Sequence, residues 1–259
     1  MRILFIGDIV GRPGRTVVGR RLPGLRGLHN PDLVVANAEN TAAGIGATPS
    51  VLQELRRHGV DVFTLGNHAW RKQEMVAAIG DLSHVVRPAN FPEGVPGRGA
   101  LTVTLSDGRR AGVLNLTGRV FMEPADCPFR AAERELAALR RETPVVLVDF
   151  HAEATSEKAA LGWHLDGRCS AVIGTHTHVQ TADEWVMPKG TGFITDAGMT
   201  GPYHSVIGMQ TAPIVDKFMR AMPRKFEVAD GPAIFSGVLL DIDDKTGVTR
   251  SITRILERD

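Results

Sequence analysis

The sequence lacks several features that would assign it to a particular class of protein. It contains only two cysteines, Cys127 and Cys169, which lie far apart and form no C-x-x-C pair. A disulfide framework is therefore excluded, and the low cysteine content fits a reducing compartment. No apolar run approaches the roughly 20 residues that a membrane-spanning helix needs, and the apolar start meets Asp8 too soon for a signal peptide. We expect a cytoplasmic protein that does not enter a membrane.

Charge and aromatic content are low as well. The 259 residues include 30 basic and 29 acidic side chains, which leaves a net charge of +1. Such a chain produces no bulk positive field, and an aromatic content of 5% offers few platforms for stacked bases, so we expect no bulk nucleic-acid binding. The Walker A, G-x-G-x-x-G and G-x-S-x-G motifs are also missing. Nothing therefore supports an NTPase, a dinucleotide-binding enzyme or a serine hydrolase.

What the chain has is a regular alternation of strands and helices. β-branched and apolar runs predict buried strands at residues 3–6, 32–36 and 60–65. Amphipathic segments between and after them predict helices at residues 11–28, 48–58 and 71–79. Strands that alternate with helices in this way are typical of a layered α/β fold.

The second half of the chain adds two hairpins, around residues 100–115 and 234–255. Between them we expect helices at 129–141, 156–161 and 212–222, strands at 143–150 and 170–174, and a glycine-rich loop at 196–203. The sequence shows no internal repeat, low-complexity tract or linker. Residues 1–259 are therefore predicted to form one domain.

Five of the predicted strands end in side chains that can bind a metal ion. These side chains are Asp8, Glu39 with Asn40, Asn67 with His68, His151, and His176 with His178. Each one alone would be interpreted as a helix cap, a turn residue or a structural histidine. Their joint occurrence at strand ends, where ligands bind in α/β sheets, indicates one crevice whose imidazoles and carboxylates are organised by a charge.

The types of ligand narrow the choice of metal. His176 and His178 lie two residues apart, so on an extended segment both would point to one face. Imidazoles mixed with carboxylate and amide oxygens, without thiolates, favour Mn, Fe or Zn over Ca or a cysteine-based zinc site. Enough ligands are present for two ions, and paired ions about 3.5–4 Å apart bind a phosphoryl group and a hydroxide nucleophile.

The ordered series Gly7-Asp8, Glu39-Asn40, Gly66-Asn67-His68, His151 and Gly174–His178 resembles the calcineurin-like metallophosphoesterases. Four positions depart from the usual pattern of that superfamily, because Val10 replaces a histidine, Glu39 an aspartate, Ala69 an acid and Thr175 a glycine. The stretches GDIVGRPG, ANAENTAAG and TDAGMTGP are similar to the YmdB-like bacterial branch, and the similarity runs from residue 1 to near 255. The resemblance implies an α/β/β/α sandwich with mixed sheets flanked by helices.

The resemblance also implies a set of metal ligands. Asp8 and His178 would hold a first ion, Glu39 would bridge, and Asn67, His151 and His176 would hold a second. Fe or Mn is expected, with Zn as the alternative. Three roles are open for Asn40: it would complete the coordination of the first ion, contact phosphate or cap the following turn. A bidentate Glu39 would also complete the coordination of the first ion.

The implied activity is that of a metal-dependent phosphodiesterase on small cyclic nucleotides such as 2′,3′-cyclic AMP. A hydroxide bridging the two ions would attack phosphorus, and His68 would protonate the leaving oxygen as general acid. His204, after the glycine-rich loop, is a candidate for substrate contact. A phosphomonoesterase or nucleotidase, and a metal-binding regulatory protein with weak turnover, are the alternatives. A homo-oligomer is expected from the usual behaviour of enzymes of this size.

Overall fold

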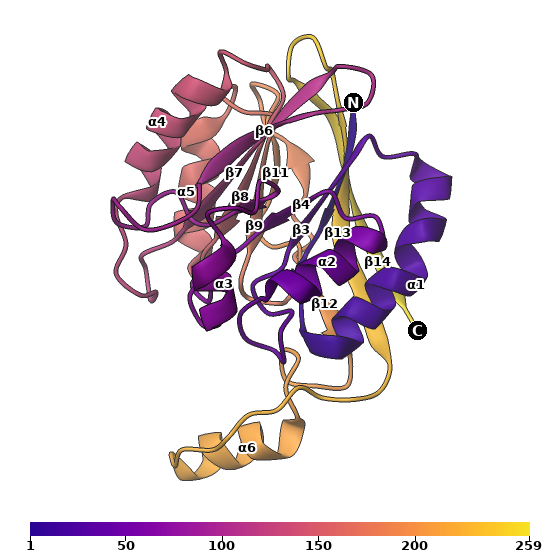
Figure 1. The fold of residues 1–259 in the computed structure, drawn as a ribbon, viewed down its shortest axis with the longest axis vertical. Helices are drawn as coiled ribbons and strands as arrows, with labels where there is room; N and C mark the ends of the chain where they lie inside the picture. The colour runs from indigo at the N-terminus through magenta and orange to yellow at the C-terminus, as the bar shows by residue number, and fades with distance from the viewer.

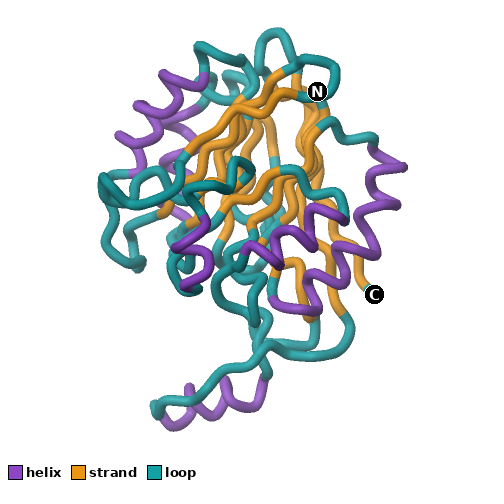
Figure 2. The backbone as a smooth tube through the Cα atoms, viewed as in Figure 1, coloured by secondary structure: helices purple, strands orange, loops and turns teal.

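Two β-sheets packed face to face form the centre of the molecule. The computed structural model describes residues 1–259, and helices cover the outer face of each sheet (Figures 1 and 2). The first sheet has eight strands in the order β2-β12-β13-β1-β3-β4-β5, with β14 paired to β13, and the second has six in the order β10-β11-β9-β8-β7-β6. Both sheets contain parallel and antiparallel pairs.

The strands and helices have the following bounds. The first sheet contains β1 (Arg2–Ile6), β2 (Asp8–Ile9), β3 (Leu33–Asn37), β4 (Val62–Thr64), β5 (Val85–Val86), β12 (Met199–Pro202), β13 (Ala233–Ile242) and β14 (Thr249–Arg258). The second contains β6 (Ala100–Thr104), β7 (Arg110–Thr117), β8 (Val146–His151), β9 (Ala171–Thr175), β10 (Trp185–Val186) and β11 (Gly192–Ile194). The helices are α1 (Gly11–His29), α2 (Pro49–Arg57), α3 (Gln73–Ala78), α4 (Pro128–Leu139), α5 (Thr155–Leu165) and α6 (Thr211–Arg220).

Alternation along the strands sorts the apolar side chains into three cores. In β1, Ile3 and Phe5 pack between the two sheets, whereas Leu4 and Ile6 pack against α1, α2 and α3. The same alternation in β8 and β9 fills a third core beneath α4 and α5. Because successive strand residues face opposite sides, strands that are apolar throughout require cover on both faces. The predicted α/β/β/α sandwich is confirmed.

One predicted loop is in fact a strand. Residues 199–202 were expected in a glycine-rich loop, but β12 pairs in parallel with β2 and antiparallel with β13. Glycine and proline are poor strand formers, so the local sequence gives no signal for this strand. Backbone pairing to two neighbours decides the conformation here.

The parallel strands of both sheets end at the same edge of the molecule. β1, β3 and β4 run parallel in the first sheet, as do β8 and β9 in the second. Figure 1 shows α6 set apart from the layers, at the tip of an excursion of the chain that we call the α6 arm (residues 203–230). None of the helices combines the length and the apolar character needed to cross a membrane.

Candidate active site

The structure gathers the predicted ligands where strands of the two sheets end. Asp8 begins β2, Glu39 and Asn40 follow β3, Asn67 and His68 follow β4, His151 ends β8, and His176 and His178 follow β9. Contacts at hydrogen-bond or ion-pair distance connect all of these side chains.

Gly66 makes this convergence possible. A Cβ atom at this position would lie 2.2 Å from Glu39 Oε2 and 2.3 Å from His151 Cδ2. Only a residue without a side chain leaves room for both groups.

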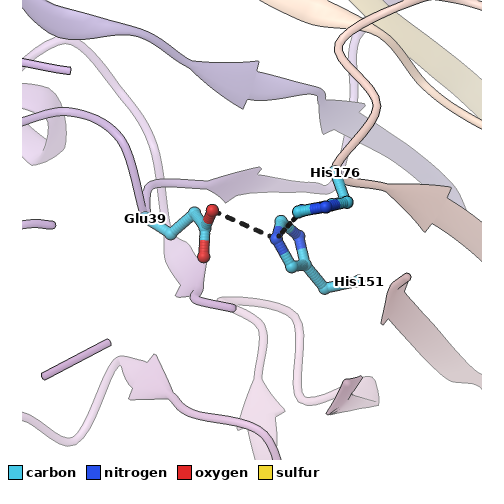
Figure 3. Close-up of side chains that lie close together, drawn as sticks. All are labelled: Glu39, His151 and His176. Carbon is cyan, nitrogen blue, oxygen red and sulfur yellow. Dashed lines mark hydrogen bonds and ion pairs between the residues drawn. The ribbon is translucent and has the colours of Figure 1, made fainter. Parts of the chain in front are cut away.

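His151 lies at the centre of a group of donor atoms that we call the second ligand set (Asn67, His151 and His176). Its Nε2 atom lies 3.1 Å from Glu39 Oε1, 3.1 Å from Asn67 Oδ1 and 3.0 Å from His176 Nδ1. Figure 3 shows Glu39 and His176 directed at this atom. A single N–H cannot serve three partners, whereas ligands about 2.0–2.2 Å from one metal ion lie about 3 Å apart. Glu39, His151 and His176 therefore suit a metal ion.

A second group of donor atoms, which we call the first ligand set (Asp8, Asn40 and His178), also lies next to Glu39. Asp8 is fully buried; its Oδ2 accepts a hydrogen bond from the His176 backbone N–H at 3.1 Å, but its Oδ1 accepts none. That oxygen lies 3.9 Å from His178 Nε2. Asn40 Nδ2 lies 3.2 Å from both His178 Nε2 and Glu39 Oε1. A buried carboxylate oxygen without a donor is rare and fits a cation bound there.

The charges of the site act strongly on one another. Burial lowers the pKa of the His151 imidazole, but the Glu39 and Asp8 carboxylates outweigh it and raise this pKa to about 9. Burial, followed by the charge of His151, lowers the pKa of His176 to about 3. Burial also raises the pKa of Asp8. Buried acidic and basic side chains that shift one another's pKa values in this way are typical of a functional site.

His176 and His178 are each held through the ring nitrogen that faces away from the cluster. His178 Nδ1 donates to the carbonyl of Ile207 at 2.8 Å, and His176 Nε2 lies 3.2 Å from Glu153 Oε2. These contacts leave His178 Nε2 and His176 Nδ1 free for a metal ion. Sequence reasoning missed both partners. Glu153 lies only two residues after His151, but a backbone carbonyl such as that of Ile207 has no signature in a sequence.

A buried chain of hydrogen bonds orients His151. Its Nδ1 lies 2.9 Å from Thr175 Oγ1, which donates to Asp149 Oδ1 at 2.7 Å. Asp149 also accepts from Thr64 Oγ1, and from Asn37 Nδ2 at 3.0 Å. Burial raises the pKa of Asp149 to about 6. This network fixes Nε2 of His151 toward the site and was not predicted.

The loop that carries His176 and His178 is not extended, contrary to expectation. The two residues have φ values of 99° and 67°, which non-glycine residues rarely adopt. The buried carboxylate of Asp196 accepts from the backbone N–H of Thr177 at 3.1 Å and from Lys158 Nζ at 2.7 Å. Because strained backbone persists only where surrounding contacts hold it, we assign this stabilising role to Asp196 and Lys158.

His68 contacts the carboxylate of Glu39 in two ways. Its backbone N–H donates to Glu39 Oε2 at 3.0 Å, and its Nδ1 lies 3.1 Å from Glu39 Oε1 and 2.8 Å from Asn40 Oδ1. Asn40 and Glu39 are thus the ring's orienting partners, which the sequence left unidentified. His68 also lines a cavity of about 510 Å³, together with Glu39, Asn40, His176 and His178.

His204 is placed differently from the other candidates. It is exposed at the start of the α6 arm, with its ring centroid 5.5 Å from that of Tyr203, and it does not line the cavity. Its contact with substrate stays a prediction.

Two proteins that are similar to this chain act on phosphoric esters according to their names. The sequence is 50% identical to the 2′,3′-cyclic-nucleotide 2′-phosphodiesterase of Bacillus subtilis (strain 168), covering 100% of this chain and 98% of that protein. A solved structure described as a novel phosphatase of Mycoplasma pneumoniae is 33% identical with a TM-score of 0.93, over 100% of this chain and 93% of that one. A hypothetical protein from Thermus thermophilus is 44% identical with a TM-score of 0.94, over 100% of both chains.

The fold, the site and these relatives define the class of the protein, which is a phosphoric ester hydrolase. Within that class, the chain belongs to the YmdB-like protein family, whose model matches residues 4–255. The resemblance drawn from the sequence motifs is thereby confirmed.

Proposed function

We propose that this protein is a dinuclear metal-dependent phosphodiesterase that opens 2′,3′-cyclic nucleotides. The observation that carries the proposal is the place of Glu39 between the two ligand sets. Its Oε1 lies 3.1 Å from His151 Nε2 in the second set and 3.2 Å from Asn40 Nδ2 in the first. The name of the Bacillus subtilis relative supports the choice of substrate.

The residues divide the work of binding between two positions. Asp8, Asn40 and His178 would hold one ion, Asn67, His151 and His176 the other, and Glu39 both. Fe or Mn fits the mixture of imidazole, carboxylate and amide donors, with Zn as the alternative. When bound, two such ions would neutralise charge on the phosphoryl group and lower the pKa of water.

His68 would supply the proton that the leaving ribose oxygen needs. The Nδ1 atom of the ring lies 3.1 Å from Glu39 Oε1, so in the protonated ring the Nδ1–H would donate to this carboxylate. The Nε2–H of the same imidazolium would then be the proton given to the leaving oxygen, because a histidine acts as a general acid in its protonated form.

Turnover of 2′,3′-cyclic AMP by metal-stripped protein tests the proposal. We expect hydrolysis only after addition of Mn²⁺ or Fe²⁺, and almost none in Asp8→Asn, which keeps the shape of the side chain but removes its charge. Two bound ions without turnover would contradict the phosphodiesterase and favour a regulatory metal-binding protein. Turnover that persists in the presence of a chelator would exclude the metal mechanism.

A phosphomonoesterase is the second candidate, because the Mycoplasma pneumoniae relative is described as a phosphatase. The comparison of p-nitrophenyl phosphate with its bis ester separates the two activities. We expect the bis ester to have the higher kcat/KM. Faster hydrolysis of the monoester would favour the phosphatase.

A further inference from the structure

The cavity beside the ligand sets has two chemically different walls. One wall is polar and consists of Glu39, Asn40, His68, Glu153, His176, Thr177 and His178. The other is mostly apolar and comes from the loop after Asn40 and from the α6 arm: Ala43, Gly44, Ile45, Ile207, Met209, Ile214 and Phe226. A polar cluster that continues into an apolar wall is the usual form of a small-molecule site.

Several large side chains of the apolar wall are open to solvent. Ile207 is 52% exposed and Phe226 is 38% exposed. Apolar side chains gathered at a functional cavity, rather than scattered over the surface, indicate a ligand that covers them.

The wall is built into the fold. The two legs of the α6 arm pair through an antiparallel bridge between Met209 and Val228, and Gln210 N donates to the carbonyl of Glu227 at 2.9 Å. The ammonium of Lys217 lies over the ring of Phe226, 4.9 Å from its centroid. These contacts fix the position of Phe226 before any ligand binds.

The wall is also tied to the first ligand set. The carbonyl of Ile207 accepts the hydrogen bond from His178 Nδ1, and Ile207 itself has a φ of 47°. A β-branched residue rarely adopts this conformation, so the arm is held in a strained geometry at the point where it meets the site. The distance between the apolar wall and the metal ligands is therefore set by a direct contact.

We propose that the apolar wall is the subsite for the nucleobase of the substrate, with Phe226 as its specificity-determining residue. The assignment rests on the proposed function, because a cyclic nucleotide whose phosphate lies at the ligand sets has its base as its remaining large apolar part. An apolar wall binds a base through its flat surface rather than through its hydrogen-bonding edge. Purine nucleotides should therefore bind more tightly than pyrimidine nucleotides, because a purine has the larger flat surface. Adenine and guanine should be distinguished only weakly.

Calorimetric binding to the Mn²⁺-loaded full-length protein tests the subsite without requiring turnover. The probes are adenosine 3′-monophosphate and inorganic phosphate, which differ by the nucleoside. We expect Phe226→Ala to lower the affinity for adenosine 3′-monophosphate by about tenfold and to leave the affinity for inorganic phosphate unchanged. Phe218→Ala is the matched control, because Phe218 belongs to α6 but is 81% exposed and does not line the cavity.

Two results would overturn the subsite. One is an equal loss of affinity for both probes in Phe226→Ala, and the other is no loss for either. Phe226→Leu, which keeps an apolar side chain of similar size, is expected to restore most of the affinity. Hydrolysis of 2′,3′-cyclic AMP by the parent protein reports separately on the proposed function. If the parent protein does not hydrolyse 2′,3′-cyclic AMP but Phe226→Ala still weakens binding of adenosine 3′-monophosphate alone, the phosphodiesterase proposal is overturned and the base subsite is kept.

Discussion

At the scale of single residues, we propose that His68 serves the site without holding a metal ion. Its backbone N–H donates to Glu39 Oε2, so any side chain at this position keeps that contact. Its ring faces the cavity. We predict that His68→Ala lowers kcat by about 10²–10⁴-fold, the usual range for a lost general acid, with both ions retained. Steady-state kinetics combined with metal analysis checks this prediction, and loss of metal in the variant would refute the role.

His151 gives the site a defined pH dependence. The carboxylates of Glu39 and Asp8 raise its pKa from 6.5 to about 9, so without metal the ring is protonated at pH 7. This pairing stabilises the metal-free fold fully below pH 6.5, and the stabilisation is lost as the pH rises through 9.

A metal ion at His151 Nε2 must displace that proton. We therefore predict that metal affinity increases from pH 7 to about 9 and levels off above that value. Calorimetry at pH 7 in buffers of different ionisation enthalpy should show about one proton released at this site. An affinity independent of pH over that interval, without proton release, would contradict the assignment.

At the scale of elements, the loop after β9 depends on a buried ion pair. Lys158 and Asp196 are both inaccessible, and Asp196 also accepts from Thr177 in the strained loop. Lys158→Met should lower the free energy of unfolding by about 3–5 kcal/mol, because it leaves a buried carboxylate without its cation. Metal affinity should fall as well, because the loop carries His176 and His178.

Urea unfolding and metal titration measure these two effects. Arg220→Met is the control, since it breaks the exposed pair between Arg220 and Asp216 on α6 and should cost less than about 1 kcal/mol. Equal effects of the two substitutions would show that burial of the Lys158 pair is unimportant.

The candidate metal ligands could be predicted from the sequence because each belongs to a local pattern, a buried strand followed by a small residue and a polar side chain. The groups that orient them could not. Glu153, Asp149 and the carbonyl of Ile207 reach the histidines only through tertiary contacts. Strand β12 could not be predicted either, because its pairing with β2 and β13 overrides the low strand propensity of its glycine and proline.

At the scale of the whole molecule, the site exists because two sheets present their carboxyl ends at the same edge. Glu39 and Asn67 come from the first sheet, and His151 and His176 come from the second. The layered arrangement could be predicted, because strands that are apolar on both faces need cover on both faces. The expected homo-oligomer stays a prediction, which a measurement of molar mass in solution would check.

The sharing of Glu39 between two ions is the central claim, and a titration of metal-stripped protein with Mn²⁺, followed by electron paramagnetic resonance, tests it most directly. We predict two ions per chain with the spectrum of a spin-coupled pair. We also predict that Glu39→Gln lowers the affinity for both ions and abolishes the spin coupling between them. A single uncoupled ion per chain, or no bound ion, would contradict the dinuclear site.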